Sequence, residues 1–288
     1  MEYRTRSYIQ LMKPGITLSN SMATAAGFML AASASGFSWQ KLIATVGGVA
    51  FVIASACVIN NILDRHIDAR MSRTKNRELV SGHIPVWNAI VYAVALGIIG
   101  FSLLSAFTNQ LTATLGVISY VWYVGVYGFA KRTTPLSTMI GAVCGALPPM
   151  AGYVAVTNTI DTTAWVLFWI LFVWQLPHFY AIAIFREQDY RKAGLPVWTT
   201  LLGKSYTKAQ ILFWVAVFVP VVALPSVLGD TGVVYAVVMT VLGLYWLLQG
   251  WYYYGRESAE KWAKRMFGIS LIVLLAFCLM ISVGGFIA

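Results

Sequence analysis

Charged side chains are scarce in this sequence. Only 10% of its 288 residues are Asp, Glu, Lys or Arg, and 59% are hydrophobic, whereas a soluble globular domain is about 25% charged and about 45 to 50% apolar. This shortage of charge argues against a water-soluble fold. The formal net charge is +10, but the basic residues are divided among separate loops, which argues against a nucleic-acid-binding surface.

Cysteine is also rare, and no extended linker or low-complexity segment interrupts the chain. The three cysteines, Cys57, Cys144 and Cys278, each lie singly inside an apolar run. That placement excludes a disulfide framework and a cysteine metal site, and it is typical of small core residues. We therefore treat residues 1–288 as a single domain.

Long apolar runs are abundant. A helix needs about 17 to 25 apolar residues to cross the hydrocarbon core, and nine runs meet this requirement, so the sequence predicts an all-α integral membrane protein with nine transmembrane helices. The predicted spans are 16–35, 43–61, 86–107, 111–129, 136–156, 162–182, 210–229, 231–254 and 266–287.

The basic residues follow every second predicted helix. All of the 20 except Lys41 lie in the amino-terminal segment or in the connections after helices two, four, six and eight. The positive-inside rule then places the amino terminus in the cytoplasm and the carboxyl terminus outside. The alternative for the first span is a signal peptide that is cleaved at Ala32-Ser33-Ala34. However, the apolar run is longer than the apolar segment of a signal peptide. Removal of the run would also leave the alternation of basic loops without its cytoplasmic start.

The two longest connections, about 62–85 and 183–209, fall on the predicted cytoplasmic side and carry acidic as well as basic groups. We expect the active-site loops there. Asp64 and Asp189 occupy matching places after helices two and six, which suggests a weak internal repeat of four helices.

The first of these connections begins with three polar residues spaced four apart. Asn60, Asp64 and Asp68 share one face of a helix with 3.6 residues per turn. Two carboxylates and an amide oxygen in one volume near the bilayer need a cation. Hard oxygen ligands completed by substrate phosphates are typical of Mg²⁺.

A basic cluster follows this stripe within about two turns. Arg73, Lys75 and Arg77 offer guanidinium and ammonium groups to phosphate oxygens, so the sequence predicts a magnesium-diphosphate site. The alternative is that Asp64 and Asp68 only pair with neighbouring arginines at a solvated helix end.

The second connection offers Asp189 as a further metal ligand and Lys192 as a phosphate contact. A simple ion pair is the alternative for Asp189, because basic residues surround it.

Several further segments carry a resemblance to a known family. Together with the Asn60–Asp68 motif, the chain resembles the UbiA-type intramembrane prenyltransferases, and within them the branch of heme O synthases. The likeness runs over essentially the whole chain. The segments specific to that branch are Lys13-Pro14-Gly15, Arg73 to Arg77 with Leu79-Val80-Ser81-Gly82, Lys131-Arg132-Thr133, Gly145 to Pro149, Trp174 to His178 and Asp189 to Gly194.

The resemblance implies a reaction of farnesyl diphosphate with heme B in a bacterial plasma membrane, with Mg²⁺ as cofactor. It implies that Asn60, Asp64, Asp68 and Asp189 hold the metal, and that Lys131 and Arg132 join the basic cluster on the diphosphate. A heme A synthase or a terminal oxidase would be a possible assembly partner. Many relatives carry Asp four residues before the position of Asp189, where this chain has Phe185. Whether Glu187, Asp189 or water completes the shell of the second metal therefore stays open.

Aromatic and imidazole groups complete the predicted site. The resemblance makes Tyr127 the first candidate to face an allylic cation through cation–π attraction, ahead of Tyr120, Trp122 and Tyr123 on the same helix. The chain has three histidines, His66, His83 and His178. His178 is the first candidate to touch heme iron, because we expect Pro177 to break the helix beside it.

Two other functions stay open at this point. An ion-coupled transporter also uses many spans and intramembrane acids, although its charged ligands lie near the midplane rather than at the cytoplasmic margin. The second alternative function is that of a prenyltransferase whose acceptor is a quinone precursor or a chlorin.

Overall fold

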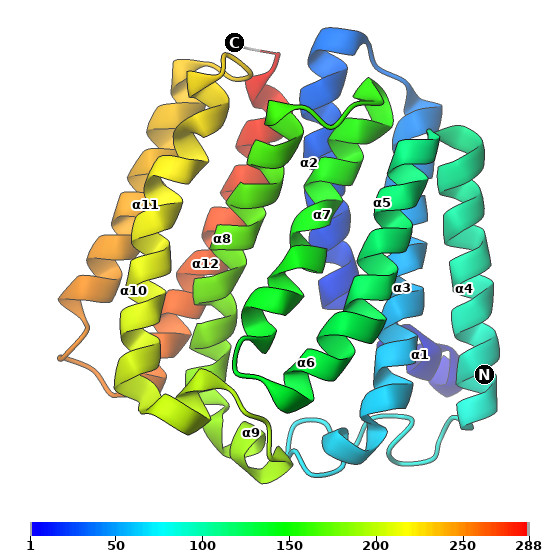
Figure 1. Cartoon of the computed structure of the whole chain (residues 1–288), viewed down its shortest axis with the longest axis vertical. Helices are drawn as coiled ribbons and strands as arrows, with labels where there is room; N and C mark the ends of the chain where they lie inside the picture. The colour runs from blue at the N-terminus through cyan, green and yellow to red at the C-terminus, as the bar shows by residue number, and fades with distance from the viewer. Residues whose placement is uncertain (1, 287–288) are drawn as a thin grey trace.

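The computed structural model describes residues 2–286, and every regular element in that range is a helix (Figure 1). The helices are α1 Glu2–Leu11, α2 Pro14–Ser35, α3 Trp39–Asp68, α4 Val86–Phe107, α5 Gln110–Val121, the π-helix η1 Trp122–Tyr127, α6 Gly128–Thr133, α7 Ser137–Thr157, α8 Thr162–Phe185, α9 Glu187–Ala193, α10 Trp198–Val227, α11 Val233–Tyr252 and α12 Ala259–Gly284.

The all-helical prediction is confirmed, and helices occupy most of each predicted span. Within residues 2–286, eight helical segments are long and apolar enough to cross a membrane; one of them is the continuous run Gln110–Thr133 through α5, η1 and α6. α2 is 22 residues long but is not among the eight, because serine, threonine and asparagine interrupt its apolar sequence. The count of nine spans therefore stays a prediction.

Side-chain caps begin several of these helices. Ser38 caps α3, Asn109 caps α5, and Asp161 caps α8 by accepting a hydrogen bond from the Ala164 amide at 2.9 Å. Each cap satisfies a backbone N–H that has no partner within its own helix. Polar residues between the apolar runs thus fix where the helices start.

The centre of the bundle lies along α7 and α8. α8 contacts α7, α10 and α12, and α7 packs closely on α2. Gly27 and Gly152 permit this approach, because a Cβ at Gly27 would lie 1.9 Å from the Pro149 carbonyl oxygen and one at Gly152 would lie 1.9 Å from that of Thr24. Small residues where two membrane helices meet are a common way to bring their backbones together.

The connections divide between two ends of the bundle (Figure 1). We call the lower end in the figure the site end; it holds α1, the connection 69–85, α6 and α9. The upper end, here called the far end, holds the connections 36–38, 108–109, 158–161 and 228–232.

The prediction that Pro177 breaks its helix is wrong. α8 continues through Pro177 to Phe185, as α7 does through Pro148 and Pro149. A proline in a membrane helix is tolerated when neighbouring helices enclose the backbone that it disturbs, and Pro177 is buried.

Candidate active site

The polar stripe of α3 lies at the site end and is enclosed by protein. Asn60, Asp64 and Asp68 all fall in the last three turns of α3, and their exposed fractions are 3%, 9% and 3%. Burying two carboxylates is costly unless positive charge and hydrogen bonds compensate them. The surroundings of each side chain therefore matter for what the stripe can bind.

Asp64 faces two basic residues from the segment after η1. Lys131 Nζ makes a short hydrogen bond to Asp64 Oδ2, and Arg132 donates to Asp64 Oδ1 at 3.2 Å and to the Leu63 carbonyl oxygen at 2.9 Å. These residues are more than 60 positions apart in the chain, so the fold, not the local sequence, brings them together.

Asp68 and Asn61 share an arginine. Arg77 donates to Asp68 Oδ2 at 2.6 Å and to Asn61 Oδ1 at 3.4 Å. Asn61 in turn donates to the Leu11 carbonyl oxygen at 3.0 Å, which ties α1 to α3. Asn61 was not predicted as part of the site, although it adjoins Asn60 in the sequence.

Asn60 contacts a residue that the sequence analysis noted only as part of the family likeness. Lys13 donates to Asn60 Oδ1 at 2.6 Å, while Asn60 Nδ2 is buried with no hydrogen-bond partner among the described residues. Lys13 has a φ of 50°, in the left-handed region where non-glycine residues are uncommon and often functional. Burial lowers the pKa of the Lys13 ammonium, because it disfavours the charged form, and an anionic ligand beside Lys13 would offset that cost.

Asp189 joins the second connection to the first. Its Oδ1 accepts from the Ser72 amide at 2.9 Å and from the Ser72 hydroxyl at 2.5 Å. Burial opposes ionisation of this carboxyl, but the two Ser72 hydrogen bonds hold its pKa below the ordinary value. Asp189 is thus an ionised group, and its Oδ2 has no hydrogen-bond partner within residues 2–286.

Glu187 is engaged elsewhere. Arg191 donates to it at 2.6 Å, and Lys204 lies 3.2 Å from its other oxygen and also pairs with Glu260. The Arg191 hydrogen bond is the main reason that the pKa of Glu187 lies below its ordinary value. This arrangement favours Asp189 over Glu187 as the ligand of the second connection.

The remaining predicted phosphate contacts are on the surface. Arg73, Lys75 and Lys192 are exposed and make no ion pair within residues 2–286. The structure therefore brings Arg77, Lys131 and Arg132 onto the acids and leaves these three side chains at the rim of the site end.

Tyr127 lies beside this charge cluster. Lys131 Nζ is 5.5 Å from the centroid of the Tyr127 ring, and the ring stacks on Tyr123 with centroids 5.5 Å apart. Gly141 of α7 leaves room for the ring, because a Cβ there would lie 2.8 Å from it. Both tyrosines belong to η1, and single π-turns inside α-helices are frequent at functional sites.

The three histidines fall in different places. His66 and His83 are exposed, and each contacts neighbouring polar groups of its own segment. His178 is partly buried on α8, where its Nδ1 lies 2.7 Å from the Ser270 hydroxyl.

The donor set fits a divalent cation together with a polyphosphate. No group of three or more His, Cys, Asp or Glu side chains in residues 2–286 is close enough to enclose a metal alone. Two carboxylates and an amide oxygen are nevertheless hard ligands of the kind that Mg²⁺ takes alongside phosphate oxygens. The unpartnered Asn60 Nδ2 and the nearby lysines and arginines are the groups that phosphate oxygens accept from.

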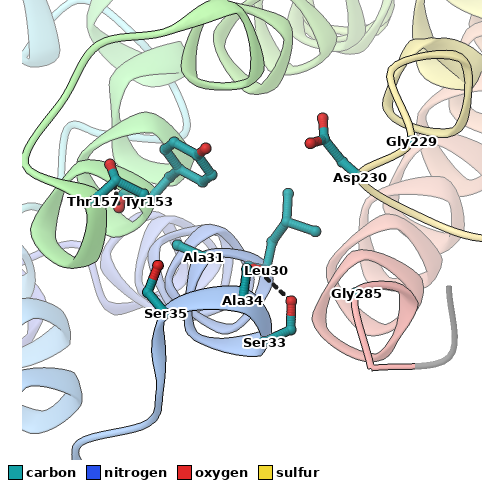
Figure 2. Close-up of a pocket in the computed structure, with 10 residues that line it drawn as sticks. All are labelled: Leu30, Ala31, Ser33, Ala34, Ser35, Tyr153, Thr157, Gly229, Asp230 and Gly285. Atoms are coloured by element: carbon teal, nitrogen blue, oxygen red, sulfur yellow. Dashed lines mark hydrogen bonds between the residues drawn. The ribbon is translucent and has the colours of Figure 1, made fainter.

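The far end holds a separate cavity of about 210 Å³ that sequence reasoning missed (Figure 2). Asp230 faces it from the connection between α10 and α11, and Tyr153 of α7 faces it from the opposite wall. The sequence feature that comes nearest to indicating this cavity is the pair Asp161 and Asp230, which lie in two of the far-end connections.

Known proteins resemble this chain in sequence and in fold. Residues 21–282 match the model of the UbiA prenyltransferase family. The protoheme IX farnesyltransferase 1 of Shewanella frigidimarina is 42% identical over 275 residues, which cover 95% of this chain and 90% of that protein. The protoheme IX farnesyltransferase of Francisella tularensis subsp. novicida is 42% identical over 276 residues, covering 95% and 98%.

Solved structures agree at the level of the fold. A digeranylgeranylglyceryl phosphate synthase superposes with a TM-score of 0.80 at 21% identity and covers 99% of both chains. A UbiA homologue from Archaeoglobus fulgidus bound to DMAPP and Mg²⁺ superposes with a TM-score of 0.68 at 18% identity, covering 96% of this chain and 99% of that one. From the family match and the identity over most of its length, this chain belongs to the UbiA prenyltransferase family.

Proposed function

We propose that this protein transfers the farnesyl group of farnesyl diphosphate to the vinyl group of heme B and so makes heme O. The observation that carries the proposal is the 42% identity to protoheme IX farnesyltransferases over 95% of the chain. It is supported by the buried Asn60–Asp64–Asp68 stripe, in which each side chain accepts a hydrogen bond from a lysine or an arginine able to bind a diphosphate.

The proposed location is the bacterial plasma membrane, with the site end in the cytoplasm. The basic residues gather at the site end, and the positive-inside rule assigns that side to the cytoplasm. α2 would be the ninth span, because it packs along α7 and α12 with the length of a membrane helix. A heme A synthase or a terminal oxidase remains a proposed assembly partner.

The acids of the site would hold magnesium and the bases would hold the diphosphate. Asn60, Asp64, Asp68 and Asp189 are the proposed ligands. Arg77, Lys131 and Arg132 already donate to Asp68 or Asp64, and these donors would turn to the diphosphate when magnesium takes the carboxylate oxygens. Arg73, Lys75 and Lys192 at the rim would attract the diphosphate as it arrives.

These bases would stabilise the charge that grows on the leaving group. When the bond between farnesyl C1 and the bridging oxygen breaks, its electron pair stays with the diphosphate, and nearby cationic donors lower the barrier to that step. Bound magnesium would add Lewis-acid stabilisation of the same oxygens.

Tyr127 would face the allylic cation that remains. Its ring lies next to Lys131, between the charge cluster and α7, and an aromatic face stabilises a cation where water is excluded. The vinyl π electrons of heme B would then form the new carbon–carbon bond to C1. Water adds to the resulting cation and loses a proton, which leaves a hydroxyethylfarnesyl side chain.

The test is a reconstituted reaction. Purified protein in detergent should convert heme B and farnesyl diphosphate to heme O only when Mg²⁺ is present, as measured by mass spectrometry of the extracted hemes. An Asp64→Ala, Asp68→Ala double variant should retain its fold and lose the activity. Full turnover by that variant would refute the site, and transfer to a quinone precursor or a chlorin but not to heme would refute the acceptor.

A further inference from the structure

A histidine on α8 is held with one ring nitrogen fixed and the other open. His178 Nδ1 lies 2.7 Å from the hydroxyl oxygen of Ser270 on α12. Nε2 has no hydrogen-bond partner within residues 2–286, and it is not among the polar atoms that are fully enclosed there. The ring therefore has one edge anchored to α12 and one edge available to a ligand.

The contacts of Ser270 decide which nitrogen carries the proton. The Ser270 hydroxyl donates to the Phe267 carbonyl oxygen at 2.6 Å, and a hydroxyl has a single hydrogen. With that hydrogen on Phe267, the hydroxyl accepts from His178, and this arrangement favours the neutral tautomer that is protonated at Nδ1. Nε2 keeps its lone pair, which is the form of imidazole that binds a metal.

Packing fixes the plane of the ring. Trp174 stacks on it with centroids 4.9 Å apart and an interplanar angle of 25°, and Phe267 lies 4.8 Å away at 34°. Trp174 also donates from Nε1 to the Ser270 carbonyl oxygen at 2.9 Å. The same serine thus anchors both the imidazole and the indole that covers it.

We infer that His178 binds the iron of the porphyrin acceptor through Nε2, and that Ser270 is the positioning residue that sets the tautomer and direction of the ring. A metal-binding histidine commonly has its other nitrogen fixed by a hydrogen-bond acceptor in this way. The inference rests on the proposed function, because it assigns how the heme acceptor of that reaction is held. His178 lies on the same half of α8 as Phe185, which leads directly into α9 and Asp189.

The experiment compares iron porphyrin with metal-free porphyrin. Ferric heme and protoporphyrin IX are titrated separately into the purified full-length protein in detergent, and Soret absorption and low-temperature electron paramagnetic resonance are recorded. The expected result for His178→Ala is loss of the histidine-ligated spectrum of heme, recovery on addition of free imidazole, and no change in affinity for protoporphyrin IX.

Ser270→Ala gives a second measure that does not depend on removing the ligand. It should weaken heme binding by about 10-fold, because loss of a partner behind a metal-binding histidine costs about 10- to 100-fold in metal affinity, and it should leave protoporphyrin IX binding unchanged. If His178→Ala fails to fold, this variant decides the question. Equal losses for both porphyrins would mean that Ser270 only supports packing and would overturn the inference.

His66→Ala and His83→Ala are the matched controls, since they remove the other two histidines of the chain from exposed positions. They should leave the heme spectrum unchanged, and loss of the histidine spectrum in either of them would overturn the assignment to His178. Unchanged heme ligation in His178→Ala, with a wild-type protein that still farnesylates heme, would reject the inference alone. A wild-type protein that neither binds nor farnesylates heme would reject the proposed function.

Discussion

The two ends of the bundle hold their carboxylates in different ways. At the site end, Asp64 and Asp68 each contact a lysine or an arginine. At the far end, Asp161 accepts from the Tyr153 hydroxyl at 2.9 Å and Asp230 accepts from the Thr163 hydroxyl at 2.8 Å. Neither far-end acid has an ion-pair partner in the part of the chain that the structure describes.

The two ends also differ in the ionisation of an acid that accepts a hydrogen bond from a hydroxyl, which is Asp189 at the site end and Asp230 at the far end. Ser72 and nearby arginines keep the pKa of Asp189 below its ordinary value at the site end. Burial, and then the negative charge of Asp161, raise the pKa of Asp230 at the far end. Asp64 and Asp68 face cationic donors that a metal and a phosphate could replace, whereas Asp161 at the far end caps α8.

The largest expected effect separates the two ends by activity. Asp68→Asn removes a charge that Arg77 and a magnesium ion would both use, so heme O formation should fall by at least about 10³-fold. Asp230→Asn removes a charge of the same type at the far end and should change the rate less than about 2-fold. Initial rates of heme O formation at saturating Mg²⁺ measure both. A large loss in Asp230→Asn would show that the two ends are coupled.

A basic residue of the site end should matter next. Lys131→Met keeps the length of the side chain but removes the cation that contacts Asp64, and we expect a loss of about 10²-fold in kcat. Lys41→Met near the start of α3 is the matched control and should retain wild-type kcat. If both variants are equally active, Lys131 does not stabilise the leaving group.

A smaller effect is expected where the two connections meet. Ser72→Ala removes the hydroxyl that holds Asp189 while leaving the backbone amide in place. We expect about a 10-fold loss of activity, of the size seen when a partner behind a metal ligand is removed, with a shift of the Mg²⁺ dependence to higher concentration. Ser35→Ala at the far end should show neither change, and an unshifted Mg²⁺ dependence in Ser72→Ala would argue against Asp189 as a ligand.

Sequence reasoning reached the parts of the site that local spacing determines. The four-residue repeat from Asn60 to Asp68 requires only helical geometry, and all three residues are buried in the last three turns of α3. It could not place Ser72 against Asp189, because the contact joins segments 117 residues apart. It was wrong about Pro177, because the rule for an isolated helix does not include the neighbouring helices that enclose α8.

The smallest expected effect tests the ionisation of the two ends through stability. Because the folded protein raises the pKa of Asp230, its charged form disfavours folding. That cost is absent below the ordinary aspartate pKa of about 3.9 and grows as the pH rises through the raised value. Asp230→Asn should therefore raise the apparent melting temperature at pH 7 by about 1 to 3 °C, and the difference should vanish near pH 4.

Asp189→Asn should have the opposite sign. The lowered pKa of Asp189 means that its ionised form favours folding above about pH 3.9, and that this contribution is lost as the pH falls through the lowered value. Its replacement should lower the apparent melting temperature at pH 7 and have less effect in acid. Thermal scans of both variants from pH 4 to pH 8, read by tryptophan fluorescence, measure the two slopes. Slopes of the same sign would mean that the Ser72 hydrogen bonds to Asp189 and the burial of Asp230 do not control the ionisation of these two acids.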